Sequence, residues 1–252
     1  MGRIKILEAR VNRLEFSDVV GTIERFIEEN NPHMVITANS LMVNYMEKDC
    51  ELKEAFENAH LVVPDSVGIV WASRFLGYGR IERIPGIDLM WKLCEIAAKK
   101  GYRIYLLGSR EAVVKGAAER LLDRFPSVTI AGTHHGYFSP GEEKNLIANI
   151  KRSSPHILFV GLSIPYQEKW ISRHMSELNV PVCIGVGGSF DVISGRLKRA
   201  PVWMRRAGME WFYRFLLEPY RLVRIMNLPV FVYKVVRQKM KSKTGGMPDN
   251  GT

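Results

Sequence analysis

Seven short apolar segments alternate with longer segments of helical periodicity through most of the chain. Each apolar segment is bounded by turn residues and predicts a buried strand, at residues 4–8, 33–38, 60–64, 103–107, 128–132, 156–160 and 182–186. The intervening segments predict helices, at residues 17–29, 41–57, 66–76, 87–100, 111–124, 141–152 and 165–178. Ser109 and Ser139 are suited to begin two of them. The alternation predicts a doubly wound α/β fold, with a mostly parallel sheet and helices on both faces.

Residues suited to ligand binding follow the predicted strands. In a parallel sheet the carboxyl ends of the strands meet at one edge, and ligands bind beyond that edge. We therefore expect one rim to carry Asn39, Asp65, Gly108, Ser109, Gly136, Tyr137, Pro165, Tyr166, Gln167, Gly187 and Gly188.

The excess of positive charge is confined to the C-terminal fifth of the chain. Residues 1–194 hold 23 basic and 23 acidic residues, whereas residues 195–252 hold 13 basic and 3 acidic residues and so carry the whole net charge of +10. From Ala200 onward the basic residues alternate with aromatic and aliphatic ones, a pattern typical of an amphipathic element on an anionic membrane surface. In a helical projection, two sets of residues fall on opposite sides. Arg214, Arg221 and Arg224 lie on one side, and the other side carries Trp211, Phe212, Phe215, Leu216, Leu222, Val223 and Met226. Pro219 either kinks this helix or begins a second one.

These changes in composition divide the chain into three parts. Residues 1–195 form the α/β domain, residues 196–242 a basic amphipathic helical appendage, and residues 243–252 a disordered end. The three cysteines form no CxxC pair, so neither a disulfide framework nor a zinc site is indicated. No segment has the pattern of a signal peptide or the roughly 20 apolar residues that span a bilayer. The sequence predicts a cytoplasmic protein.

Seven ordered motifs carry a family resemblance. They are TANS at 37–40, PDSVGIVWASRFLG at 64–77, ERIPGID at 82–88, LLGSREAV at 106–113, HGYF at 135–138, GLSIPYQEKW at 161–170, and the long segment at 185–224. Together they resemble the WecG/TagA/CpsF family of glycosyltransferases. PDSVG departs from the ADG-like string of many members but keeps the aspartate.

The resemblance implies a donor, an acceptor and a location. The last motif is similar to that of family enzymes which add N-acetylmannosamine to N-acetylglucosamine-diphospho-undecaprenol in wall teichoic acid synthesis. We therefore expect a UDP-sugar donor, with UDP-N-acetylmannosamine implied by the resemblance alone, and a polyprenyl-diphosphate-linked acceptor. Residues 1–195 would be the catalytic domain, and residues 196–242 would hold it at the inner face of the cell membrane. No cofactor is expected.

Glycosyl transfer needs a base for the acceptor hydroxyl and positive charge near the departing diphosphate. Asp65 is the candidate base, which is also the role implied by the resemblance; its alternative role is to cap the next helix. No DxD string is present, so we expect transfer without a metal, with arginines on the diphosphate. Inversion at the anomeric carbon is a separate expectation. The candidates are Arg83, Arg214, Arg221 and Arg224, with a surface or lipid-facing position as the alternative for each. His134 and His135 form a poor metal site, because adjacent strand residues point to opposite faces.

Several uncharged and small residues are candidates for substrate binding. Thr37, Asn39 and Gln167 can bond to sugar hydroxyls or an N-acetyl group, although helix capping and strand-end bonds are equal alternatives. Backbone approach of the nucleotide is expected at Gly108, Gly136, Gly187 and Gly188, with Ser109 and Tyr137 beside them. Asp191 would accept from ribose hydroxyls, or else cap a helix.

Two other classes of function compete with this interpretation. The basic tail allows a nucleic-acid-binding module, but its interleaved apolar residues favour a lipid surface, so no nucleic-acid partner is expected. A nicotinamide oxidoreductase is disfavoured because GVGG lacks the spacing of the GxGxxG fingerprint. The donor sugar, the stereochemical outcome and homo-oligomer formation stay open.

Overall fold

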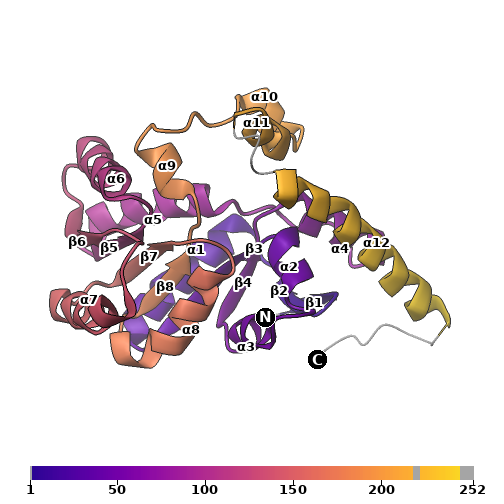
Figure 1. Cartoon of the computed structure of the whole chain (residues 1–252), viewed down its shortest axis with the longest axis horizontal. Helices are drawn as coiled ribbons and strands as arrows, with labels where there is room; N and C mark the ends of the chain where they lie inside the picture. Colours follow the sequence, from indigo (N-terminus) through magenta and orange to yellow (C-terminus); the bar gives the residue numbers. More distant parts are fainter. Residues whose placement is uncertain (1, 218–221, 245–252) are drawn as a thin grey trace.

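A six-stranded parallel sheet forms the centre of the protein. The structure is a computed structural model and describes residues 2–217 and 222–244. The strands are β3 (His33–Ala38), β4 (Leu61–Pro64), β5 (Arg103–Gly108), β6 (Thr129–His134), β7 (Ile157–Gly161) and β8 (Val182–Gly185). Their order is β4-β3-β8-β7-β5-β6, and each pair is parallel. The predicted α/β fold is confirmed (Figure 1).

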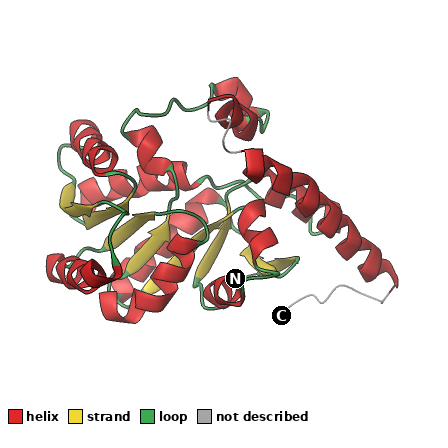
Figure 2. Ribbon diagram, in the orientation of Figure 1, coloured by secondary structure: helices red, strands yellow, loops and turns green. Residues whose placement is uncertain are grey.

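Helices cover both faces of the sheet because successive strand residues point to opposite sides. Val35 belongs to a core with α1 (Phe16–Glu29), α5 (Gly86–Lys100), α6 (Glu111–Arg124) and α9 (Ser189–Ile193). Its neighbour Ile36 belongs to the opposite core, with α2 (Ser40–Tyr45), α3 (Cys50–Glu57), α4 (Val67–Leu76), α7 (Pro140–Ser153) and α8 (Tyr166–Leu178). Figure 2 shows the strands enclosed between these two layers.

Two predicted elements differ from the structure. The strand expected at residues 4–8 is instead an antiparallel hairpin outside the main sheet, β1 (Arg3–Ile6) and β2 (Ala9–Asn12). Its turn includes Leu7 with a left-handed φ of 54°. The helix expected at residues 41–57 is divided into α2 and α3, because the Asp49 side chain accepts the backbone N–H of Leu52 and begins a new helix.

The two proposed helix starts have different outcomes. Ser139 is the N-cap of α7, where it forms a capping box with Glu142. Ser109 does not cap α6: it has a φ of 55°, and Arg110 is the N-cap without a side-chain bond. A residue with left-handed backbone ends a strand sharply, which turns the chain from β5 across the rim before α6 begins.

The C-terminal segment returns to the body as three helices, α10 (Val202–Arg206), α11 (Glu210–Leu217) and α12 (Leu222–Thr244). Figure 1 shows α12 running past α2 and α4 and extending beyond the body. Phe231 and Val235 of α12 are fully buried, and Asn44 of α2 donates to the backbone oxygen of Asn227 (2.8 Å). Pro219 lies between α11 and α12, outside the described residues.

None of the helices described in residues 2–217 and 222–244 combines the length and the apolar character needed to cross a membrane.

Candidate active site

A cavity of about 530 Å³ opens at the carboxyl ends of β3, β4 and β8. Body residues form its floor, while Trp211 and Phe215 of α11 and Leu228 and Val232 of α12 form part of its wall. Seven of the residues selected from the sequence line it: Thr37, Asn39, Asp65, Arg83, Gln167, Gly187 and Gly188. The parallel topology thus brings together residues that are up to 151 positions apart in the chain.

Asp65 lies directly after β4 and is half-buried. Its backbone N–H donates to the Ala38 carbonyl (2.9 Å), and its Oδ1 accepts from the Gly86 N–H at the start of α5 (2.8 Å). The helix-cap alternative is wrong for α4, because Ser66 is the N-cap there and accepts from the Ile69 N–H. Asp65 instead presents its carboxylate to the first backbone N–H of α5.

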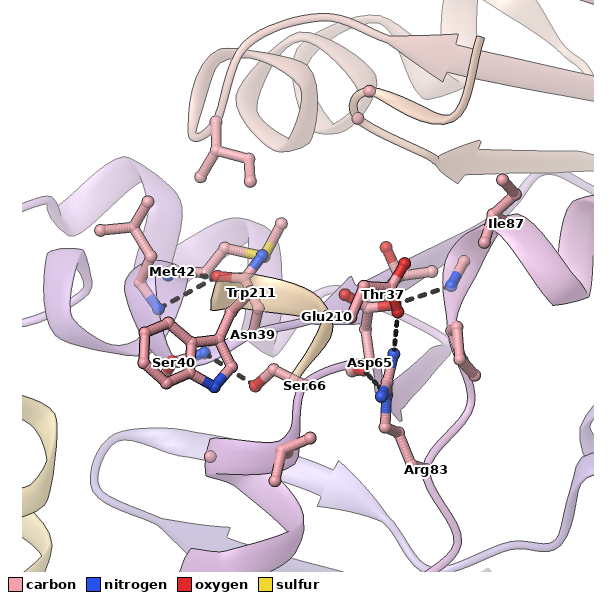
Figure 3. A pocket seen from close by; sticks show the side chains of 18 of the residues that line it. Thr37, Asn39, Ser40, Met42, Asp65, Ser66, Arg83, Ile87, Glu210 and Trp211 are labelled. Atoms are coloured by element: carbon pink, nitrogen blue, oxygen red, sulfur yellow. Dashed lines mark hydrogen bonds and ion pairs between the residues drawn. The ribbon is translucent and has the colours of Figure 1, made fainter. Parts of the chain in front are cut away.

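Arg83 lies beside Asp65, with its guanidinium held from two directions. Its Nε donates to the Asp65 backbone oxygen (2.9 Å), and its Nη2 donates to Glu210 Oε2 (2.7 Å). Figure 3 shows Arg83 reaching both residues from below the cavity. Glu210 belongs to α11, so the C-terminal segment contacts the edge that carries the candidate base.

The three uncharged candidates line the cavity and also make structural hydrogen bonds. Thr37 donates from Oγ1 to the Gly185 carbonyl (2.8 Å), which joins β3 to β8. Asn39 is the N-cap of α2, as its alternative role predicted, and its Oδ1 accepts from Leu41 and Met42. These bonds fix both side chains at the cavity wall (Figure 3).

Gln167 has both ends of its amide engaged. Its Oε1 accepts from the Gly187 N–H (3.0 Å), and its Nε2 donates to Glu168 Oε1 (2.6 Å). Glu168 is 1 % exposed, and burial raises its pKa to about 7 although the Gln167 bond acts in the other direction. Its buried Oε2 has no hydrogen-bond partner among the described residues.

A second group of candidates lies along the same edge, over β5, β6 and α9, but does not line the cavity. Gly108 has a φ of 138°, and a Cβ there would collide with the Gly161 backbone, so only glycine fits. The Gly136 N–H donates to the Ser109 carbonyl (2.9 Å), and Ser109 Oγ lies 3.5 Å from Asp191 Oδ2. Gly108, Ser109, Gly136 and Asp191 are therefore close together.

The remaining members of this group differ in environment. Asp191 is not the N-cap of α9, a position that Gly188 holds, and its Oδ1 pairs with Arg196 (2.6 Å). Tyr137 is 72 % exposed beside Gly136. An exposed ring beside a glycine-lined edge can stack on a nucleobase.

The three tail arginines lie beyond what the structure describes. Arg221 is outside the described residues, and the side chains of Arg214 and Arg224 are outside them as well. Their position relative to the diphosphate stays a prediction.

The side chains of the two adjacent histidines lie together, whereas the sequence predicts that they point to opposite faces of a strand. β6 ends at His134, so the alternation of strand side chains stops there, and the His134 and His135 rings lie with centroids 4.5 Å apart. Across residues 2–217 and 222–244, however, no group of three histidine, cysteine or acidic side chains is placed to hold a metal ion.

Sequence reasoning missed Glu210 and Arg199. Arg199 forms a bidentate pair with Asp88 (2.6 and 2.7 Å), and its Nε lies 3.9 Å from Glu210 Oε1. The sequence signal for Glu210 is the scarcity of acidic residues in the tail, since residues 195–252 hold only 3 of them.

The sequence matches the "Glycosyl transferase WecG/TagA/CpsF family" over residues 4–245. A Bacillus subtilis (strain 168) protein is 34% identical over 222 residues, covering 88% of this chain and 86% of its own length. A Staphylococcus aureus (strain NCTC 8325 / PS 47) protein is 35% identical over 243 residues, covering 96% and 95%. Both relatives are named N-acetylglucosaminyldiphosphoundecaprenol N-acetyl-beta-D-mannosaminyltransferase.

Proposed function

Because the chain belongs to the WecG/TagA/CpsF family of glycosyltransferases, we propose that it transfers N-acetylmannosamine from UDP-N-acetylmannosamine to N-acetylglucosamine-diphospho-undecaprenol. The names of its relatives in B. subtilis and S. aureus support this acceptor and this sugar. The observation that carries the proposal is the cavity in which the Asp65 carboxylate, the Arg83 guanidinium and the polar Thr37 and Asn39 side chains meet.

Asp65 is the general base in this proposal. It takes the proton of the acceptor hydroxyl as that oxygen attacks the anomeric carbon of the donor, and the bond from this carbon to the UDP oxygen breaks. The Gly86 N–H on Oδ1 holds the carboxylate in one orientation, which is what a positioned base requires. A single in-line displacement inverts the anomeric carbon, so the β product in the relatives' names needs an α-linked donor.

Arginine stabilises the departing diphosphate. Arg83 lies at the cavity wall beside Asp65, and a guanidinium forms charge-assisted bonds to phosphate oxygens. Arg214, Arg221 and Arg224 add to this charge from the C-terminal segment. The absence of a DxD string from the sequence supports transfer without a metal.

The nucleotide would occupy the edge next to the cavity. Gly108, Ser109 and Gly136 present backbone there without bulky side chains, and the Asp191 carboxylate can accept from ribose hydroxyls. Gly187, which lines the cavity and is bonded to Gln167, connects this group with the sugar position.

Residues 196–242 act as the membrane-binding appendage of a catalytic body formed by residues 1–195. Exposed apolar side chains support this role, among them Trp203 (64 %), Leu216 (59 %) and Tyr233 (61 %). They occur in a segment rich in lysine and arginine, and this combination favours adsorption to an anionic bilayer from the cytoplasmic side. A polyprenyl-linked acceptor stays in that bilayer, so adsorption brings the cavity to its substrate.

Replacing Asp65 by asparagine tests the base directly. Asp65→Asn keeps the oxygen that accepts from Gly86 but removes the proton acceptor, so we expect UDP binding to persist and transfer to fall by roughly 10²–10⁴-fold. The control is Asp123→Asn, which neutralises an exposed carboxylate of α6. Near-normal transfer by Asp65→Asn would remove this residue from the mechanism.

A further inference from the structure

Glu210 is a buried acid in an otherwise basic segment. Residues 195–252 hold only 3 acidic residues, and Glu210 is 7 % exposed although it begins an amphipathic helix with exposed aromatic residues. A buried carboxylate is stable only when it is paired and hydrogen-bonded. Its partners therefore indicate why it is there.

Two of those partners are arginines. Glu210 Oε2 accepts from Arg83 Nη2 (2.7 Å), and Oε1 lies 3.9 Å from Arg199 Nε. Arg199 comes from the segment before α10 and is itself held in a bidentate pair by Asp88 of α5. The ion pairs thus extend from the body through the C-terminal segment and back to Arg83.

Arg83 is fixed by contacts at both ends of its guanidinium. Its Nε donates to the Asp65 backbone oxygen and its Nη2 to Glu210, as Figure 3 shows. A guanidinium has five N–H donors in a rigid plane, so two bonds on different nitrogens set the direction of the whole fork. The Glu210 bond is the one supplied by the C-terminal segment.

We propose that Glu210 is a positioning residue that orients Arg83 for the donor diphosphate once the C-terminal segment is docked. The inference rests on the proposed function, since it takes Arg83 as a diphosphate ligand. Blocking of the diphosphate by Glu210 is the opposite interpretation. The geometry disfavours it, because Glu210 bonds to one nitrogen of Arg83 instead of forming the two parallel bonds with which a carboxylate would replace a phosphate.

The test is transfer by the full chain with UDP-N-acetylmannosamine and a water-soluble N-acetylglucosamine-diphospholipid acceptor, which removes membrane binding from the measurement. Glu210→Gln keeps the shape and one acceptor oxygen but removes the charge. We expect kcat to fall roughly 10- to 100-fold, the usual cost of a misplaced catalytic group. Glu210→Asp, which keeps the charge but shortens the reach, should fall between Glu210→Gln and wild type.

A double-mutant cycle separates positioning from a structural role. In an Arg83→Gln background, the added Glu210→Gln change should have almost no further effect, because the residue it acts through is gone. If Glu210 had a purely structural role, the fold-decreases in kcat of the two single variants would multiply in the double variant. The matched control is Glu82→Gln, an exposed carboxylate next to Arg83 in sequence that bonds to the Phe16 N–H, and it should keep the wild-type rate.

The outcomes distinguish this inference from the proposed function. A wild-type chain that transfers no N-acetylmannosamine contradicts the proposed function. Active wild type with a Glu210→Gln rate equal to it, or higher, overturns the positioning role, and a higher rate identifies Glu210 as a blocking residue. Melting temperatures for all variants show whether a lost rate is lost folding; should Glu210→Gln not fold, the Glu210→Asp rate and its coupling to Arg83→Gln decide the question.

Discussion

Replacing Glu168 by glutamine should change how the stability of the protein depends on pH. Glu168 is fully buried beside Gln167, and burial raises its pKa from the ordinary 4.5 to about 7. The difference of about 2.5 pKa units corresponds to about 3 kcal/mol in the free energy of unfolding. Glutamine has the same shape and keeps an oxygen that accepts from Gln167, but it does not ionise.

The sign follows from the direction of this pKa change. Below pH 4.5 the carboxyl is protonated in both the folded and the unfolded chain, so the residue adds no pH dependence. As pH rises from about 4.5 to about 7, the unfolded chain loses its proton first, and the wild type becomes less stable. Above pH 7 this loss is complete. Glu168→Gln should therefore gain about 3 kcal/mol relative to wild type across this interval.

Urea unfolding followed by tryptophan fluorescence measures the effect, since Trp170 on the same helix is fully buried. In Glu168→Gln the amide nitrogen takes the place of Oε2, which has no hydrogen-bond partner among the described residues. Burying this nitrogen without a partner lowers the stability by an amount that is independent of pH. This amount shifts the difference in unfolding free energy between variant and wild type equally at every pH, and leaves the slope of that difference against pH unchanged. Asp123→Asn, which neutralises an exposed carboxylate of α6, is the control and should give a difference in unfolding free energy that does not change with pH. A flat curve for Glu168→Gln would refute a buried carboxyl with a raised pKa.

Three further predictions concern the metal and the C-terminal segment. EDTA should leave the transfer rate unchanged, since the proposed mechanism uses arginines in place of a metal ion. Strong inhibition that magnesium or manganese reverses would contradict this part of the mechanism. A chain ending at Gly195 should stay folded, because the six-stranded sheet precedes that residue. It should lose vesicle binding, and it should lose transfer even to a soluble acceptor. Transfer to that acceptor at the full rate would mean that the C-terminal segment only binds the membrane. Leu216→Glu should weaken binding to anionic vesicles at least about tenfold in a sedimentation assay, because it places a charge on an exposed apolar residue; unchanged binding would place the contact elsewhere.

The sequence predicts the sheet and its rim well because both follow from local patterns. Apolar runs define the strands, and parallel pairing then places Asp65 and Gln167 at one edge without knowledge of any contact. Both line the observed cavity. For Asn39, helix capping and a position in the cavity do not exclude each other, since this residue caps α2 and also lines the cavity.

Contacts between distant residues could not be predicted in this way. Arg83 and Glu210 are 127 positions apart, and nothing in either local sequence identifies the other as its partner. The predicted alternative that Asp65 caps α4 is wrong by one residue. Asp65 and Ser66 are both suitable N-cap residues, and only the structure shows that Ser66 holds this position. The sequence predicts one strand in place of the N-terminal hairpin, because a leucine gives no turn signal although Leu7 has a positive φ.

Product analysis with a panel of UDP-sugars tests which reaction the protein catalyses. The full chain is incubated with each donor and a short-chain N-acetylglucosamine-diphospholipid acceptor, with anionic vesicles present. We predict that UDP-N-acetylmannosamine alone gives efficient release of UDP and a disaccharide with a β-linked N-acetylmannosamine. Preference for another UDP-sugar would contradict the proposed donor, and an α-linked product would contradict the proposed inverting displacement.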